Sequence, residues 1–302
     1  MRAIWLTDIF DSALLSSSGK SSPKNSSPIG SALRAMGWDK SDHTTIAYLA
    51  HHGEQNLFLA YDVPKAERFS KYPEKLLKKH ATKLDTRSLK TKLHIITEES
   101  PSLKSGVERV IDFAQKDRAD LVALQTHSRT GFKRFLLGSF AETMMLLSPV
   151  SLLILNPDAS INPQTKRILF ATDLDKSADE GVKRAAQFAR HAGASLRLLH
   201  IALPSYSAKF KGQDPEVTKY RKHVDRRIQE QVDLAETVGV DCDAVIRDDI
   251  LPKTDLILKE AKASQADVVA VHSKSGPLRR LILGSVARQV VRAAKVPVLV
   301  VR

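Results

Sequence analysis

A glycine followed by a serine occurs twice in similar surroundings, and this pair is suited to contacts with phosphate. The stretch KRFLLGSFAE contains Gly138 and Ser139, and the stretch RRLILGSVAR contains Gly284 and Ser285. At the start of a helix, free backbone N–H groups and the positive end of the helix dipole attract an anion. The glycine permits close approach and the serine adds a hydroxyl group. Phosphate binding is one interpretation, and an ordinary helix N-cap is the other.

The two copies indicate an internal duplication. Ser139 and Ser285 lie 146 positions apart in a chain of 302 residues, a length that fits two domains of ordinary size. We expect a first domain over residues 1–158, with a Ser/Pro-rich insertion at about 12–28, and a second domain over 163–302.

Apolar runs alternate with helix-like segments in both halves. The runs that predict buried strands are 3–7, 44–50, 93–97, 120–128 and 150–155 in the first half, and 167–172, 195–201, 242–247, 267–273 and 296–301 in the second. Strands that alternate with helices indicate an α/β fold with a parallel sheet. We therefore expect two doubly wound domains, each with a five-stranded parallel sheet in the order 3-2-1-4-5 flanked by helices.

The last strand of each half is apolar on both faces and is expected at a sheet edge. Exposed apolar edges favour association, so we expect the two edges to meet in an intramolecular pseudo-dimer. A homodimer and an unidentified protein partner are also compatible with the sequence.

The predicted topology brings the polar residues together. In an open parallel sheet, ligands bind beyond the carboxyl ends of the strands where the strand order reverses, here between the first and fourth strands. Asp8 and Asp173 follow the first strand of each half, and carboxylates there could accept hydrogen bonds from a base amine or a ribose. A role as simple turn or cap residues is the equal alternative.

Composition narrows the classes of function. The net charge is +13, spread over both halves, which permits phosphate-bearing or acidic partners, although a solvated basic surface is the favoured explanation. No aromatic-interleaved basic platform accompanies the charge, so nucleic-acid binding is disfavoured. The single cysteine, Cys242, precludes an intramolecular disulfide and favours the cytoplasm.

Several activities lack their sequence patterns. The longest apolar runs are too short for a membrane-spanning helix. The sequence contains no HxH or HExxH pattern for a metal site. It also has no nucleophile elbow or recognisable Ser-His-Asp pattern, so we expect no enzyme activity beyond, at most, slow nucleotide hydrolysis.

Two longer stretches resemble a known family. The segment THSRTGFKRFLLGSFAE, followed by a helix and SPVSLLIL, resembles the terminal part of universal stress protein domains, and HSKSGPLRRLILGSVARQVVRAAKVPVLVV resembles it more closely. The resemblance covers nearly the whole chain as two tandem domains. It implies a Rossmann-like fold, pairing of the two domains and a cytoplasmic stress-response role. In many members it also implies bound ATP, with no metal beyond the Mg²⁺ that accompanies the nucleotide.

The ATP-binding members of that family share the spacing Gly-x2-Gly-x9-Gly-Ser/Thr. In the first half Ser128 stands at the second glycine position with the nine-residue spacing intact, whereas in the second half Ser273 precedes Gly284 by ten intervening residues. The compact loop after Asp173 favours the second half as the site for ATP or ADP. The residues expected at the two sites are Thr172, Asp173, Ile201, His272, Ser273, Gly276, Gly284 and Ser285 in the second half, and Asp8, Ser128, Arg129, Gly131, Gly138 and Ser139 in the first.

Two functions of different class follow. One is a stress-response protein that binds an adenine nucleotide with little or no catalysis. The other is an interaction module that binds no nucleotide and whose basic surface recruits an acidic partner.

Overall fold

The structure, a computed structural model of the chain, describes ten strands and the helices that connect them. The described residues are 1–7, 28–51, 71–82, 84, 86, 88–100, 102–126, 139–206, 214–273 and 284–302. The first half contains β1 (Arg2–Leu6), α2 (Pro28–Ala35), β2 (His43–His51), α4 (Lys71–Ala81), β3 (Thr91–Glu98), α5 (Leu103–Lys116), β4 (Leu121–Gln125), α6 (Ser139–Leu147) and β5 (Ser151–Leu155). The second half contains β6 (Arg167–Thr172), α7 (Lys176–Ala192), β7 (Ser195–Ile201), the short 3-10 turn η3 (Pro204–Tyr206), α8 (Pro215–Thr237), β8 (Cys242–Arg247), α9 (Lys253–Ala263), β9 (Val268–His272), α10 (Ser285–Ala293) and β10 (Val298–Val301).

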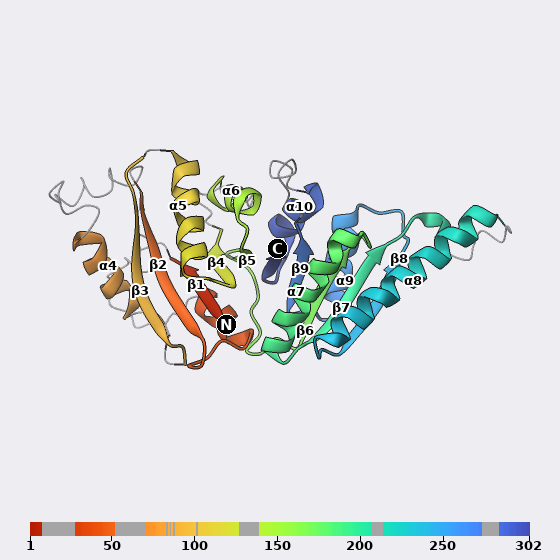
Figure 1. Ribbon diagram of the computed structural model, residues 1–302, viewed down its shortest axis with the longest axis horizontal. Helices are drawn as coiled ribbons and strands as arrows, with labels where there is room; N and C mark the ends of the chain where they lie inside the picture. Colours follow the sequence, from red (N-terminus) through yellow and green to blue (C-terminus); the bar gives the residue numbers. More distant parts are fainter. Residues whose placement is uncertain are drawn as a thin grey trace.

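The strands form one sheet that extends along the long axis of the molecule, from β3 at one end to β8 at the other (Figure 1). Its order is β3-β2-β1-β4-β5-β10-β9-β6-β7-β8, so each half keeps the order 3-2-1-4-5 and all neighbours within a half are parallel. The expected α/β fold and the meeting of the last strands are confirmed. The number of sheets differs from the expectation, since the two five-stranded arrays are halves of a single ten-stranded sheet.

The two halves join through an antiparallel pairing of β5 with β10. Leu152, Leu153 and Ile154 lie opposite Val300, Leu299 and Val298. Every residue of both strands is buried, which explains why both read as apolar on two faces. The pairing removes two edges that would otherwise expose unpaired backbone groups.

Helices cover both faces of the sheet. The helices α2, α4, α7 and α8 pack on one face, and α5, α6, α9 and α10 pack on the other. Helix α7 shows how the sequence produces this arrangement, because its apolar residues recur at helical spacing and face the core. It ends at Gly193, whose φ of 65° is the left-handed conformation that glycine adopts without strain.

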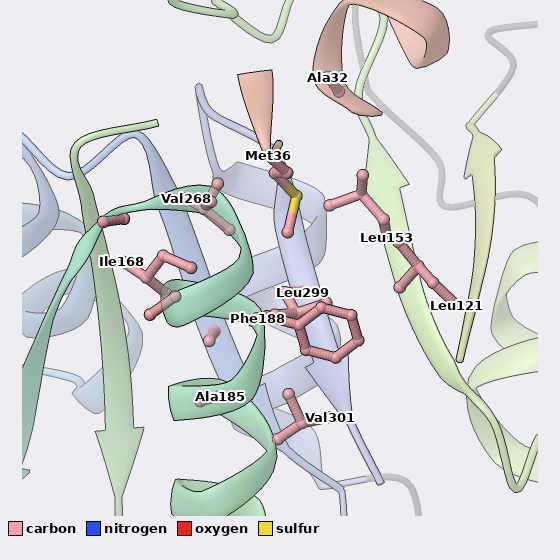
Figure 2. Close-up of a cluster of buried hydrophobic side chains, with 14 of the residues drawn as sticks. Ala32, Met36, Leu121, Leu153, Ile168, Ala185, Phe188, Val268, Leu299 and Val301 are labelled. Carbon is pink, nitrogen blue, oxygen red and sulfur yellow. The ribbon is translucent and has the colours of Figure 1, made fainter. Parts of the chain in front are cut away.

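A hydrophobic cluster crosses the junction between the halves. Figure 2 shows Met36 and Leu153 of the first half beside Phe188 and Leu299 of the second. The junction continues at Trp38, whose ring lies 6.2 Å from that of Phe188 and 4.6 Å from that of His191, centroid to centroid. The segment that follows α2 therefore belongs to the contact between the halves.

Each half also caps a helix of the other half. Asn156, which follows β5, donates through Nδ2 to the carbonyl oxygens of Val291 (2.7 Å) and Ala294 (3.0 Å) at the end of α10. Arg302, which follows β10, donates to the carbonyl oxygen of Met145 in α6. Met145 and Val291 are the seventh residues of their helices, so the two contacts are related by the duplication. We call them the reciprocal caps.

Gly37 allows the two halves to approach closely and provides a test of the junction. Its φ is 90°, and an added Cβ would lie 2.3 Å from the carbonyl oxygen of His191. Gly193 also has a positive φ, but no atom lies within 4 Å of an added Cβ. A left-handed alanine alone costs about 1 kcal/mol. In urea unfolding we expect Gly193→Ala to lower the free energy of unfolding by about that amount, and Gly37→Ala to lower it clearly more. Equal losses in the two variants would contradict the close contact at Gly37.

The junction also makes stability depend on pH. Burial lowers the pKa of His191 below its usual 6.5, and the carboxylate of Asp42, 3.2 Å from Nε2, opposes this shift without cancelling it. The stability that neutral His191 contributes is fully present above the unfolded-state pKa and is lost as the pH falls through the lowered one. Burial lowers the pKa values of His94 and His200 in the same direction.

We therefore expect the free energy of unfolding to fall between about pH 7.5 and about pH 5.5, and to fall less in His191→Gln. Urea titrations of both proteins at the two pH values measure this difference. The same fall in variant and parent would show that His191 does not carry the effect.

Candidate functional site

A cavity of about 530 Å³ lies at the carboxyl ends of β6, β7 and β9, beside the first turns of α9 and α10. The strand order of the second half reverses between β6 and β9, so this is the place where a doubly wound sheet binds ligands. The volume lies in the range of sites for small molecules and cofactors.

Most of the residues expected in the second half meet at this cavity. The lining includes Thr172, Asp173, Ile201, His272, Ser273 and Gly284. Ser285 is the first residue of α10, is exposed and does not line the cavity. Gly276 lies outside the described residues.

The site expected in the first half falls mostly outside the described residues. Those residues are Asp8, Ser128, Arg129, Gly131 and Gly138. Ser139 is the exposed first residue of α6, which is the position expected from the sequence. The first-half site therefore stays a prediction.

Side-chain alternation along the strands sorts the lining residues by face. The hydroxyl of Thr172 donates to Oε1 of Gln231 on α8 over 2.8 Å. The ring of His272 packs against Gly181 of α7, where an added Cβ would lie 2.9 Å from it. These two side chains are engaged on the α7–α8 face, which leaves their backbone atoms for the cavity. Asp173 directly follows Thr172, and Ser273 directly follows His272. By the same alternation, Ile201 directly follows His200 on β7. These three side chains are therefore expected on the α9–α10 face of the sheet.

The loop between β6 and α7 is braced by α8. Leu174 has a φ of 61° in the left-handed region, its N–H donates to Thr172 Oγ1 (3.1 Å), and its carbonyl oxygen accepts from Arg227 Nε (3.1 Å). Arg227 and Gln231 both donate to Asp179, over 2.8 and 2.9 Å. The adjoining Asp173 is thus held on a fixed turn.

His200 supports the same turn from β7. Its Nδ1 lies 3.1 Å from the carbonyl oxygen of Thr172, and because a carbonyl can only accept, Nδ1 carries the proton. Burial lowers the pKa of His200, the hydrogen bond to Thr172 opposes that shift, and Lys253 adds to it. The imidazole is therefore neutral at pH 7.

The cavity combines an apolar floor with a charged rim. Ala171, Leu199, Ile257, Val271 and Ala287 supply apolar lining. Lys253 is the one lysine or arginine among the described lining residues, and no described carboxylate lies within ion-pair distance of it. Together with the start of α10 it favours an anionic ligand, while Asp173 provides an acceptor.

Sequence reasoning missed Lys253 and Ile257, which reach the cavity from the first turns of α9. A signal was present, because every helix that follows a strand of a parallel sheet begins at the carboxyl edge. No group of three or more metal-binding side chains converges within the described part of the chain.

Comparison with known proteins identifies relatives of the fold. The model of the universal stress protein family matches residues 40–156 and 164–302. A universal stress protein from Archaeoglobus fulgidus is similar over 100% of this chain and 98% of its own, with 20% identity and a TM-score of 0.67. A functionally unknown protein from Pseudomonas aeruginosa PAO1 is similar over 99% of this chain and 92% of its own, with 14% identity and a TM-score of 0.55.

A further matched structure is of a universal stress protein from Archaeoglobus fulgidus in complex with dAMP. It covers 45% of this chain and 98% of its own, with 21% identity and a TM-score of 0.36. No curated protein is a match.

The brace on the β6–α7 loop provides a test of this geometry. Gln231 is fully buried and bonds to both Thr172 and Asp179, whereas Gln229, two residues away on α8, is exposed and bonds to Asp233 alone among the described residues. Gln231→Leu leaves the buried hydroxyl of Thr172 without an acceptor, so we expect a loss of about 1–3 kcal/mol in the free energy of unfolding. Gln229→Leu is the matched control, and a loss of the same size in both would contradict the brace.

Proposed function

This chain belongs to the universal stress protein family, and on that premise we propose that it binds an adenine nucleotide, ATP or ADP, in its second half with little or no catalysis. One observation carries the proposal, namely that Thr172, Asp173, Ser273 and Gly284 border a single cavity with an apolar floor. The floor suits a base, and the carboxylate of Asp173 suits a base amine or a ribose hydroxyl. The start of α10 and the ammonium of Lys253 suit phosphate groups.

The surroundings of Gly284 support the place of the phosphates. Within the described part of the chain, no atom lies within 4 Å of a Cβ added at this residue, and its backbone conformation, φ −55° and ψ 131°, is one that any residue adopts. The glycine is therefore not required by the fold, and the space beside it is available to a ligand. Any Mg²⁺ would arrive with the nucleotide.

The hydroxyl groups near the cavity give no support to catalysis through a side-chain nucleophile. The Thr172 hydroxyl is already bonded to Gln231, and no histidine or carboxylate among the described residues bonds to the Ser273 hydroxyl. An activated nucleophile needs such a base. We infer a stress-response role in which nucleotide occupancy is the signal, and a cytoplasmic location is consistent with the one cysteine, Cys242, being free and buried. None of the described helices is long and apolar enough to cross a membrane.

The alternative, an interaction module, has one observation in its favour. Lys219, Lys222, His223 and Arg226 recur at helical spacing on the N-terminal part of α8 and line an open hollow together with Glu216. Such a basic face suits an acidic protein partner.

Thermal unfolding with ATP, ADP and AMP separates the two functions. A ligand that binds only the folded state stabilises it by about 2.7 kcal/mol at a hundredfold excess over its dissociation constant. We expect this stabilisation in the parent chain and its loss in Asp173→Ala and in Gly284→Val, the second of which adds bulk beside the proposed phosphate position.

The control lies in the same variants without ligand. Gly284→Val is expected to lower the free energy of unfolding by no more than about 1 kcal/mol, because the added side chain meets no described atom, although valine is a poorer N-cap than glycine. No stabilisation by any nucleotide at millimolar concentration would favour the interaction module. Stabilisation that survives both substitutions would move the site to the first half.

A further inference from the structure

Arg302 connects the cavity of the second half to a helix of the first. Its guanidinium donates through one terminal nitrogen to the carbonyl oxygen of Ser273, over 3.0 Å, and through the other to the carbonyl oxygen of Met145 in α6. Ser273 lines the cavity and directly follows β9. One side chain thus holds a residue of each half.

The charge of Arg302 has an unusual setting. No carboxylate among the described residues lies within ion-pair distance of the half-buried guanidinium, and its Nε is a buried donor without a partner. Burial lowers the pKa of Arg302 to about 10, so the group is still charged at pH 7. Its compensation comes from the two carbonyl oxygens, and Met145 lies in the C-terminal part of α6, where the helix dipole favours a cation.

The end of β9 depends on the contact between Arg302 and Ser273, whereas the equivalent end of β4 in the first half is held by other bonds. The amide of Ser273 reaches the carbonyl oxygen of Val301 over 3.4 Å, which is long for a hydrogen bond. At the equivalent place in the first half, the Thr126 amide donates to Leu155 over 2.8 Å, and the Thr126 hydroxyl donates to Oδ1 of Asn156 over 3.0 Å. The first half is therefore held by regular short bonds, whereas the second relies on the arginine.

We propose that Arg302 is a positioning residue that fixes Ser273 at the wall of the second-half cavity, so that nucleotide affinity there depends on α6 of the first half. This inference rests on the proposed function. Arg302 acts through Ser273 and through α6. A displacement of α6 moves the guanidinium, and with it the residue from which the chain leaves β9 beside the cavity.

The test compares the two reciprocal caps in the full chain. Isothermal titration with ADP is carried out on the parent, Arg302→Met, Arg302→Lys and Asn156→Ala. We expect about tenfold weaker binding in Arg302→Met and an intermediate loss in Arg302→Lys, which keeps the charge but lacks the two-pronged reach. Asn156→Ala removes the mirror contact without touching Ser273, and because Asn156 caps the far end of α10, whose first turn borders the cavity, we expect it to weaken binding clearly less than Arg302→Met does.

Equal weakening in Arg302→Met and Asn156→Ala would reduce Arg302 to a general structural role and overturn the inference, as would unchanged affinity in Arg302→Met. If Arg302→Met does not fold, Arg302→Lys is compared with Asn156→Ala. Equal weakening in these two variants, or unchanged affinity in Arg302→Lys, would then overturn the inference.

A measurement without ligand separates this inference from the proposed function. Hydrogen–deuterium exchange at the Ser273 amide is expected to be faster in Arg302→Met than in the parent, while Asn156→Ala leaves it unchanged. Unchanged exchange in Arg302→Met overturns the positioning role whatever the parent binds. Failure of the parent to bind ADP overturns the proposed function and the affinity part of this inference, whereas faster exchange would still support the contact itself.

Discussion

The antiparallel pairing of β5 with β10 is the constraint on which the rest of the molecule depends. Three opposed residue pairs join two parallel arrays whose strands are otherwise hydrogen-bonded only within their own half. Both strands are buried on both faces, so separation of the halves would expose their backbone edges together with the leucines and valines that they carry. The cluster around Met36 and Phe188 and the reciprocal caps exist only while these strands are paired.

The pairing also sets the position of the cavity. The strand β9 pairs with β10 on one side and with β6 on the other, and Val301 lies opposite His272 in that ladder. The end of β9, where Ser273 lines the cavity, is thus one strand away from the junction. On the opposite wall, the β6–α7 loop is braced by Arg227 and Gln231 of α8. One wall of the cavity is fixed within the second half and the other through contact with the first.

Much of the fold could be predicted because its signals are local. Buried parallel strands appear as apolar runs, and Gly193 marks the end of α7. The site could be predicted only as far as the order of strands determines it, which brought Asp173, Ser273 and Gly284 to one edge. Lys253 was missed although the topology puts the start of α9 at the carboxyl edge, whereas the engagement of Thr172 with Gln231 joins residues 59 positions apart and has no local signal. The contact of Gly37 with His191 was missed for the same reason, since it depends on the packing of one half against the other.

The antiparallel junction has a geometric consequence for a molecule with two related halves. Because β5 and β10 run in opposite directions, the carboxyl ends of the first-half strands point to one rim of the sheet and those of the second half to the other. The residues expected to form the first-half site therefore follow strands that end at the opposite rim from the cavity of the second half. Any influence of one rim on the other must therefore pass through the backbone and side chains that lie between them.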